Sequence, residues 1–567
     1  MEKFIKKNIM NWGLRKINIV SAVGVLFLIC KTMTAQVAPE KYWIQFTDKD
    51  NSPYSVSTPL DYLSQRSIDR RAFQSISITV QDFPVNPIYV QTVKQTATLR
   101  VLVSSKWLNG IVIQTTDTSG LNQVLNLPFV DSAGSKSVMS PFLGVKSTKM
   151  DVVGFKTVVE DLPQLGAEVI DYGFSETQNK MIHVDYLHDL GYTGSGMVIA
   201  VLDAGFYGAD TTTILQPLFT ENRVLGTWDF VLDQPVDYTQ YSNHGAFVLN
   251  SMAGNIPGFY VGSAPDASYW LLRTEDAPTE NIIEEYNWVA GAEFADSVGA
   301  DIFNTSLGYT TFDDSTQNHT YADLDGNTTI ITIGSDIAAS KGVLVVNSAG
   351  NSGGNSWRYI GAPADGDSVL AIGAVYPDRV VTGFSSRGPS YDGRVKPNVM
   401  AMGGSVPMPI GVDTIFNING TSFSGPILAG AAACLWQSQN SYTSMDVFHA
   451  IEESADQFNT PNDDYGFGIP NFGLAHYFIT GVNDISQNGL SINAYPNPTK
   501  GIAYFPIIDS DVSVTISNSI GKVVYLDTNL ARIYESYQVD FSSFPTGIYF
   551  VEIKSMKGVQ WVRVIRS

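Results

Sequence analysis

From about residue 166 to residue 480, continuously apolar runs alternate with amphipathic segments. The apolar runs include "VIAVLD", "VLVVNS" and "SVLAIGAV", which have few polar positions, as expected of strands covered on both faces of a sheet. One helical face of the segment 281–300 collects the apolar residues Ile282, Tyr286, Val289 and Ala290. Strands and helices in alternation predict an α/β fold with a doubly wound, mostly parallel sheet.

The regions on either side of this one have different patterns. Residues 36–165 mix strand-like runs, such as "KYWIQFTD", "SISITV" and "TLRVLVSSKWLNGIVIQT", with the helix-like "PLDYLSQRSIDRRAF", which predicts a small α+β domain. From about residue 485, the linker-like "AYPNPTKG" precedes short strand-like runs separated by turns, a spacing typical of a β-sandwich. We therefore expect three folded domains, at 36–165, 166–480 and 485–567.

The N-terminus has the pattern of a secretory signal peptide. A basic segment precedes "INIVSAVGVLFLIC", an apolar core shorter than the ~20 residues of a membrane-spanning helix. We expect a signal peptide at residues 1–35, cleaved after Ala35, and the bulky Ile29 disfavours lipid attachment at Cys30. The exported chain would then keep one cysteine, Cys434, which predicts a small buried side chain and no internal disulfide.

The charge balance bears on possible partners. The chain has 34 Lys and Arg residues against 55 Asp and Glu residues, which gives a net charge of −21. This charge repels nucleic acid phosphates and anionic membrane surfaces. We therefore expect no nucleic-acid partner.

Three polar residues of the central region fall where a parallel sheet usually holds its active site, beyond the carboxyl ends of strands. Asp203 follows a buried strand, His244 opens an apolar helix-like stretch, and Ser422 lies in "GTSFSGP" before a long apolar helix. Taken singly, each has a structural explanation as a cap, a turn or a packed side chain. A hydroxyl at a helix start, however, lies near unpaired N–H groups that favour negative charge.

The order of these residues along the chain is more informative than any one of them. Asp203, His244 and Ser422 occur in the order Asp, His, Ser, which is the subtilisin order and not that of chymotrypsin or the α/β-hydrolases. A further buried strand leads into Asn351. Six motifs in succession make the central region resemble the subtilase family of serine proteases: "VIAVLDAGF", "NHGAFV", "GSAPDASYWLLR", "DIFNTSLG", "VVNSAGN" and "NGTSFSGP".

The resemblance implies a role for each matching residue. Ser422 would attack the scissile carbonyl, and His244 would take its proton and deliver it to the leaving amine. Asp203 would orient the imidazole. Asn351 would donate its side-chain amide to the oxyanion beside the Ser422 backbone N–H. The implied function is that of a secreted serine endopeptidase.

The resemblance also implies a peptide substrate. Ser306, Leu307 and Gly308 would form a wall of the substrate channel and pair with an extended peptide as an added strand. An esterase or lipase is disfavoured because no Gly-x-Ser-x-Gly motif surrounds Ser422. We therefore expect proteins or peptides as substrates.

Some positions depart from the family pattern. Ala204 replaces a Ser or Thr, Phe247 replaces a second histidine, and Phe423 and Ser424 replace Met and Ala. None of these changes removes a catalytic group, so we expect activity, with substrate preference as the property they would alter. The rival hypothesis is a catalytically inactive surface binding protein that has kept the fold.

The two serines of the stretch "GTSFSGP" are expected to have different roles. Ser422 occupies the nucleophile position of the family, whereas Ser424 is expected to be a bystander in the first helical turn. Pro426 is expected in the same turn, where a missing N–H has no intrahelical partner to lose.

The segment "YADLDGNTT" has some features of a metal-binding loop. Asp323, Asp325 and Asn327 alternate there, but the segment lacks the glycine placement and the later glutamate of an EF-hand loop. We expect helix capping at this place, assign no metal ligand and expect no cofactor.

The flanking domains also resemble known modules. Residues 36–165 would be a propeptide that assists folding and blocks the channel, with removal in the region 150–178 and with Arg70 and Arg71 on a helix face. Residues 485–567 resemble the sorting domain of type IX secretion cargo, which implies the type IX secretion machinery as a partner and a location at the cell surface or outside the cell. A generic β-sandwich that binds carbohydrate or protein is the alternative.

Overall fold

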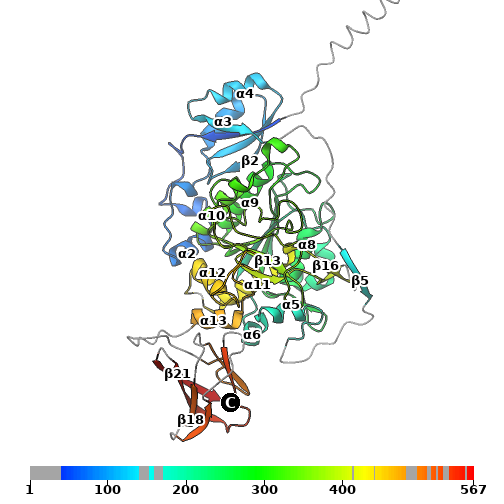
Figure 1. Ribbon diagram of the computed structural model, residues 1–567. Helices are drawn as coiled ribbons and strands as arrows, with labels where there is room; N and C mark the ends of the chain where they lie inside the picture. Colours follow the sequence, from blue (N-terminus) through cyan, green and yellow to red (C-terminus); the bar gives the residue numbers. More distant parts are fainter. Residues whose placement is uncertain are drawn as a thin grey trace, which may run out of the picture.

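The structure, a computed structural model, describes residues 40–138, 152–158, 170–410, 414–439, 441–480, 494–506, 513–518, 522–527, 536–555 and 558–567. They form an N-terminal unit (residues 40–138), a central domain (residues 170–480) and a C-terminal unit (from residue 494), which run from blue to red in Figure 1. The expected signal peptide lies outside the described residues. No helix among the described residues is long and apolar enough to cross a membrane.

The central domain is built on one seven-stranded sheet with the strand order β14-β13-β12-β11-β6-β10-β7, in which every neighbouring pair is parallel. From β6 the chain adds strands in both directions, which confirms the doubly wound α/β fold. The strands are β6 (Val198–Asp203), β7 (Val224–Asp229), β10 (Ser268–Arg273), β11 (Ile302–Thr305), β12 (Leu344–Ser348), β13 (Val369–Val375) and β14 (Val399–Met402).

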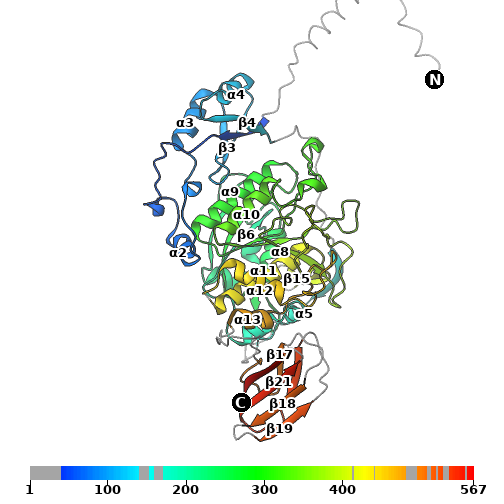
Figure 2. The ribbon, with the colours of Figure 1, turned by 60° about the vertical axis from the view of Figure 1, so that its left-hand side comes forward.

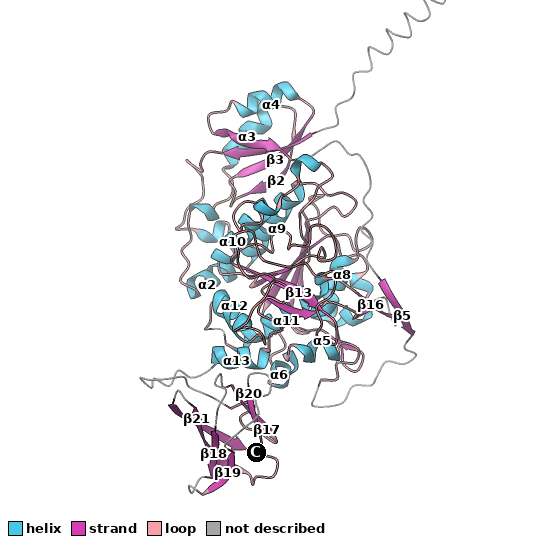
Figure 3. Ribbon diagram, in the orientation of Figure 1, coloured by secondary structure: helices cyan, strands magenta, loops and turns pink. Residues whose placement is uncertain are grey.

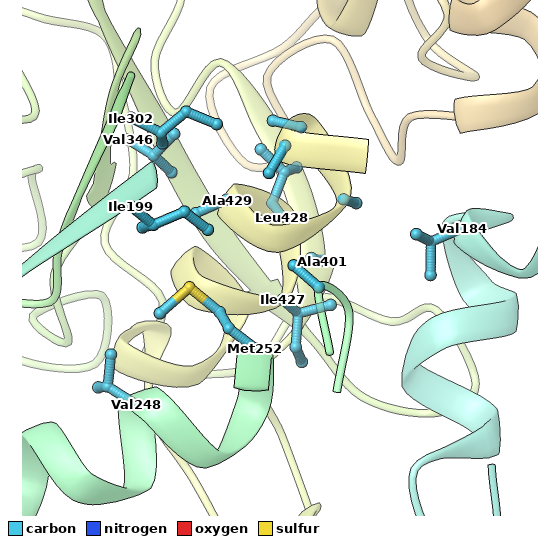
Figure 4. Close-up of a cluster of buried hydrophobic side chains, with 14 of the residues drawn as sticks. Val184, Ile199, Val248, Met252, Ile302, Val346, Ala401, Ile427, Leu428 and Ala429 are labelled. Carbon is cyan, nitrogen blue, oxygen red and sulfur yellow. The ribbon is translucent and has the colours of Figure 1, made fainter. Parts of the chain in front are cut away.

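Helices cover both faces of this sheet, as Figure 3 shows. Alternate residues of β6 face opposite layers: Ile199 and Val201 belong to the core under α8 and α11, whereas Ala200 and Leu202 belong to the core under α9 and α10. Figure 4 shows part of the first core. The four helices are α8 (His244–Ala253), α11 (Thr421–Ser438), α9 (Ile283–Val298) and α10 (Ile330–Ser340).

Helix α11 runs through the middle of the domain. Its residues from Thr421 to Trp436 are all buried, as expected of a helix that is apolar all round. Cys434 lies in this stretch and is a buried free cysteine, as predicted. The remaining elements of the domain are α5 (Glu176–Met181), α6 (Val184–Asp189), α7 (Gln216–Thr220), α12 (Ser444–Glu453), α13 (Phe472–Thr480), β8 (Asn255–Ile256), β9 (Tyr260–Val261), β15 (Val406–Ile410) and β16 (Thr414–Ile418). Strand β5 (Val152–Val158) pairs with β16.

The N-terminal unit is a four-stranded antiparallel sheet with the order β2-β3-β1-β4 and helices beside it, as the sequence predicts for an α+β unit. One expected strand is absent: residues 75–80 form no strand, because Ser75 has a φ of 58° and Val80 starts a short turn capped by Thr79 and Asp82. The elements are β1 (Glu40–Phe46), β2 (Arg100–Ser105), β3 (Gly110–Thr115), β4 (Val130–Ser137), α2 (Gln65–Phe73), α3 (Pro87–Thr96) and α4 (Thr118–Leu125).

The N-terminal unit packs against α9 of the central domain, beside which it lies in Figures 1 and 2. The rings of Trp43 in β1 and Tyr286 in α9 have centroids 4.7 Å apart. Arg70 and Arg71 lie on α2, as predicted, but they face inward and form buried ion pairs with Asp296 of α9. Helix α9 is therefore buried on both sides, by the central sheet and by the N-terminal unit.

The C-terminal unit consists of two antiparallel sheets, as expected of a β-sandwich. Ala503 and Phe505 of one sheet share a core with Val514, Ile516 and Val551 of the other. The first sheet holds β17 (Ile502–Pro506) and β20 (Ser536–Asp540), and the second holds β18 (Ser513–Asn518), β19 (Val523–Asp527), β21 (Gly547–Ser555) and β22 (Gly558–Arg566).

Candidate active site

The fold brings the four expected catalytic residues to one edge of the central sheet. Asp203 is the last residue of β6, and Asn351 follows β12 by three residues. His244 is the first residue of α8, and Ser422 is the second residue of α11. Carboxyl ends of strands and amino ends of helices thus meet here, as they do at the ligand sites of open α/β sheets.

Asp203 and His244 form a direct hydrogen bond. The imidazole Nδ1 lies 2.8 Å from Asp203 Oδ1, and the Asp203 side chain is fully buried while that of His244 is 20% exposed. The approach depends on Gly245, since a β-carbon there would lie 2.9 Å from the Asp203 β-carbon and 2.6 Å from the Gly205 carbonyl oxygen. The Ala204 N–H also donates to Asp203 Oδ1, whereas Oδ2 has no hydrogen-bond partner among the described residues.

The surroundings of His244 favour its protonated form. Burial lowers the pKa of His244, but the charge and the hydrogen bond of Asp203, together with the charge of Glu275, raise it above the ordinary value of 6.5. With Nδ1 bonded to Asp203, Nε2 is left to exchange a proton with a group in the cleft.

Ser422 lies at the amino end of α11 and is 8% exposed. Its hydroxyl donates to the carbonyl oxygen of Ser306 at 3.4 Å and not to His244. The His244 imidazole lies close by, with its ring centroid 6.1 Å from that of Phe423. A long or open serine–histidine contact is common in enzymes without bound substrate. The second serine, Ser424, is fully buried, and its hydroxyl donates to the Thr421 carbonyl.

The orientation of Asn351 follows from its partner. Its Oδ1 accepts hydrogen bonds from the Thr421 backbone N–H at 2.9 Å and from the Thr421 hydroxyl at 3.0 Å. A backbone N–H can only donate, so the oxygen must face Thr421 and Nδ2 must point away from it. The amide donor and the Ser422 N–H, which has no intrahelical acceptor at the second helical position, are both available to an oxyanion.

The prediction that Pro426 lies in the first helical turn was wrong. Pro426 is the sixth residue of α11, where an ordinary residue would donate its N–H to the Ser422 carbonyl. The Ser306 hydroxyl donates to that carbonyl instead, at 2.9 Å. The proline therefore leaves the Ser422 carbonyl able to accept a hydrogen bond from the Ser306 hydroxyl, and this bond connects the Ser306 loop to the start of α11.

The segment Ser306 to Gly308 follows β11 and lies next to Ser422. Ser306 and Leu307 are buried, whereas Gly308 is exposed, and a β-carbon at Gly308 would meet only the Ala362 carbonyl oxygen, at 3.9 Å. The Leu307 carbonyl accepts from Asn347 Nδ2 at 3.3 Å. The loop is thus held by Asn347 at Leu307 and is open at Gly308.

An acidic cluster close to His244 was not found from the sequence. Glu275, Glu280 and Glu284 lie together, and the charges of Glu275 and His244 influence each other. Burial, followed by the charges of Glu280 and Asp203, raises the pKa of Glu275 to about 8. Burial and the charges of Glu275 and Glu280 also raise the pKa of Glu284. The acidic run "TEDAPTENIIEE" was the available signal in the sequence.

The segment "YADLDGNTT" has capping and turn hydrogen bonds. Asp323 accepts hydrogen bonds from the N–H and hydroxyl of Thr320, and Asp325 accepts from the Asn327 N–H at 2.9 Å. The cap of α10 is supplied by Thr329, which accepts from Thr332 N–H. Asp323 therefore caps only the short turn Tyr321–Asp323, and the expectation that Asp323, Asp325 or Asn327 caps the following helix was wrong.

Comparison with known proteins adds family evidence for each unit. Residues 194–468 match the model of the Subtilase family, residues 41–149 match "Peptidase S8 propeptide domain, Bacteroidota", and residues 493–566 match "Secretion system C-terminal sorting domain". The sorting domain indicates export by type IX secretion to the cell surface or the extracellular space.

Several relatives named as subtilisins or as an alkaline protease are similar to about half of this chain. Subtilisin E of Bacillus subtilis (strain 168) is 31% identical over 292 residues, which is 51% of this chain and 67% of the relative. Subtilisin of Bacillus pumilus is 30% identical over 308 residues, which is 54% of this chain and 98% of the relative. An alkaline protease of Alkalihalobacillus alcalophilus is 27% identical over 307 residues, or 54% and 69% of the two chains. The chain belongs to the subtilase family and is a secreted serine endopeptidase.

Proposed function

We propose that Ser422, His244 and Asp203 hydrolyse peptide bonds of protein substrates, with Asn351 as the oxyanion donor. The observation that carries the proposal is the 2.8 Å hydrogen bond between His244 and the buried Asp203, at the amino end of the helix that holds Ser422. A buried carboxylate fixes the imidazole tautomer and stabilises the imidazolium that forms in the reaction.

The reaction follows from these positions. His244 Nε2 takes the proton of the Ser422 hydroxyl as its oxygen attacks the scissile carbonyl carbon. The negative oxygen of the tetrahedral intermediate accepts hydrogen bonds from Asn351 Nδ2 and the Ser422 N–H. His244 then gives the proton to the departing amine, which leaves an acyl-enzyme. Water, deprotonated by His244, attacks the acyl carbon and releases the second product with Ser422 restored.

Substrate binding is assigned to Ser306, Leu307 and Gly308. The exposed Gly308 has space for an approaching backbone, so an extended peptide can add to this edge by main-chain hydrogen bonds. Such pairing is tolerant of sequence, which suits a protein substrate. The hydrogen bond from Ser306 to the Ser422 carbonyl holds the substrate-binding segment in a fixed position relative to the nucleophile.

The test of the nucleophile is the variant Ser422→Ala, with Ser424→Ala as the matched control in the same helix. We expect casein hydrolysis to disappear in the first variant and to persist in the second. An inactive binding protein, the rival hypothesis, would hydrolyse casein in neither the parent chain nor the control. Hydrolysis by Ser422→Ala at the parent rate would overturn the assignment.

We further propose that residues 36–165 act as an inhibitory propeptide. The N-terminal unit docks through α9, where the Glu293 carboxylate accepts hydrogen bonds from the Lys106 and Trp107 backbone N–H groups at 2.7 and 2.9 Å. The proposed processing region, 150–178, contains β5 and otherwise lies partly outside the described residues. The mature enzyme would arise when the chain is cut there.

Residues 485–567 are proposed to engage the type IX secretion machinery. The match to a sorting domain and the separate core of the C-terminal unit support a detachable export signal. Deleting residues 485–567 should hold the protein in the periplasm, as measured by immunoblotting of cell fractions. Release of the shortened chain to the surface or medium at the parent level would contradict this role.

A further inference from the structure

Three glutamates converge where β10 leads into α9. Glu275 and Glu280 lie in the connecting loop, and Glu284 lies in the first turn of α9. One carboxylate oxygen from each lies within 4.8 Å of the other two. Two oxygens bound to one Ca²⁺ at about 2.3–2.6 Å can be at most about 5 Å apart. We propose that Glu275, Glu280 and Glu284 bind one divalent cation of the calcium type, next to the catalytic site.

Three buried oxygen atoms at the glutamate cluster have no hydrogen-bond partner among the described residues. Glu284 is 1% exposed and Glu275 is 9% exposed, and Oε2 of each has no partner among the described residues. The hydroxyl of Tyr309, a residue that is 1% exposed and follows the substrate wall, is also without a partner there. Burial, and then the charges of Glu275, Glu284 and Glu280, raise the pKa of this hydroxyl, so it lies in the field of the three carboxylates. A bound cation with its water would satisfy these oxygen atoms together.

The loop that carries the cluster is held in place. The Glu280 N–H donates to Asp313 Oδ2 at 3.2 Å, and the Asp313 N–H donates to the Glu280 carbonyl at 2.8 Å. The Asn281 N–H donates to Glu284 Oε1 at 3.2 Å. Backbone hydrogen bonds therefore fix the loop that brings the carboxylates close together, and a bound cation would lower the repulsion between them.

Burial also decides between two kinds of positive ligand. A lysine or arginine side chain of a substrate would need an open channel to reach Glu284, which is almost fully enclosed. A bare ion needs only a small cavity and a route in, and Glu280 is partly exposed at the edge of the cluster. Hard oxygen ligands of this type are those that Ca²⁺ prefers. The geometry thus favours an ion over a substrate side chain.

Two basic groups, Arg273 and Lys41, lie near the cluster. The guanidinium of Arg273 is already paired with Asp229 and Asp276, at 2.8 and 2.9 Å. Lys41 of the N-terminal unit lies in the field of Asp276 and Glu284. If the N-terminal unit is removed on processing, Lys41 leaves with it, and the cluster should then attract a cation more strongly. The ion would thus replace part of the stabilisation that α9 loses with that unit.

The test uses the full chain with Ser422→Ala, so that binding is measured without proteolysis and does not depend on the proposed catalytic roles. Calcium chloride is titrated into the chelator-treated protein by calorimetry, and unfolding temperature is measured with calcium and with EDTA. Glu280→Gln and Glu284→Gln should each bind one Ca²⁺ fewer per chain than the parent, or bind it at least about tenfold more weakly. Glu221→Gln, which removes an exposed carboxylate paired with Arg223, is the matched control and should bind as the parent does.

The unfolding temperature separates a weakened site from a damaged fold. In EDTA, Glu280→Gln should unfold cooperatively, as the parent does, whereas calcium should stabilise the parent more than the variant. Equal calcium stoichiometry, affinity and stabilisation in the parent and both cluster variants would overturn the proposal. The proposal would also fail if calcium had no effect and, in chains that keep Ser422, Glu280→Gln instead raised KM only for substrates with Lys or Arg, because the cluster would then bind the substrate.

Discussion

Replacing Asp296 by asparagine should weaken the binding of the N-terminal unit to α9. Asp296 is fully buried and faces three cations of that unit: Arg70, Arg71 and Lys106. Its Oδ2 lies 2.7 Å from Arg71 and 3.4 Å from Lys106. Burial raises the pKa of Asp296, but the three cations together lower it to about 2, so the carboxylate stays charged in the complex until the pH falls to that range.

The size of the effect can be bounded. A fall in pKa from 3.8 to about 2 corresponds to roughly 2 kcal/mol in favour of the charged form. Removing one partner of a buried ion pair costs about 3–5 kcal/mol, because the remaining charges stay buried without compensation. Asp296→Asn should therefore weaken inhibition by the N-terminal unit between about 30-fold and about 5,000-fold.

The assay titrates processed enzyme with a separately produced polypeptide of residues 36–165 and measures the inhibition constant on a chromogenic peptide. Activity without inhibitor should be unchanged in Asp296→Asn, and Glu221→Gln serves as the surface carboxylate control. Arg71→Ala in the polypeptide should couple to Asp296→Asn in a double-mutant cycle. Inhibition constants within about threefold of the parent, or strictly additive effects, would refute the reasoning.

Three further predictions concern the active site. Asn351→Leu should lower kcat by about 10²- to 10³-fold, the loss known for the oxyanion asparagine of a subtilisin, with KM nearly unchanged; a loss confined to KM would contradict the role. Because the pKa of His244 is raised and the base must be neutral, kcat/KM should fall as the pH drops through a midpoint above 6.5. In Asp203→Asn this midpoint should move down while kcat falls about 10⁴-fold, and an unmoved midpoint would argue against the electrostatic effect of the carboxylate. Ser306→Ala should cost ~1–3 kcal/mol in urea unfolding, since the Ser422 carbonyl loses its donor. Pro426→Ala in that background should restore part of the loss by supplying an N–H, and no restoration would contradict this hydrogen-bond assignment.

The sequence was sufficient for the fold and for the identity of the candidate residues. Buried parallel strands are read as apolar runs, and β6 and β12 appear where "VIAVLD" and "VLVVNS" predict them. Asp203 and His244 stand at element ends, so chain order and element type alone predict that they meet. The prediction of a strand at residues 75–80 was wrong. Alternation of apolar and polar residues shows that a segment can form a strand, but not that a partner strand is available to it.

Contacts between distant segments could not be predicted from the sequence. Arg70 and Arg71 look like ordinary charges on a helix face, and only the docking of α2 against α9 makes them buried partners of Asp296. The role of Pro426 depends on the exact residue at which α11 starts, and the sequence does not define helix starts to within one or two residues. The sequence pattern therefore placed Pro426 in the first turn. Glu275 and Glu284 are separated by a loop that is held by hydrogen bonds between Glu280 and the distant Asp313, so their convergence has no local signature in the sequence.

The most direct test of the catalytic proposal is covalent labelling of the purified, processed enzyme with a fluorophosphonate, followed by peptide mapping. A hydroxyl reacts with this reagent when a neighbouring base takes its proton, so labelling reports the nucleophile and its base together. We expect a single adduct on Ser422, lost in Ser422→Ala and strongly slowed in His244→Ala, with Ser424→Ala labelled at the parent rate. An adduct on another residue, or parent-level labelling of Ser422→Ala, would contradict the proposed active site.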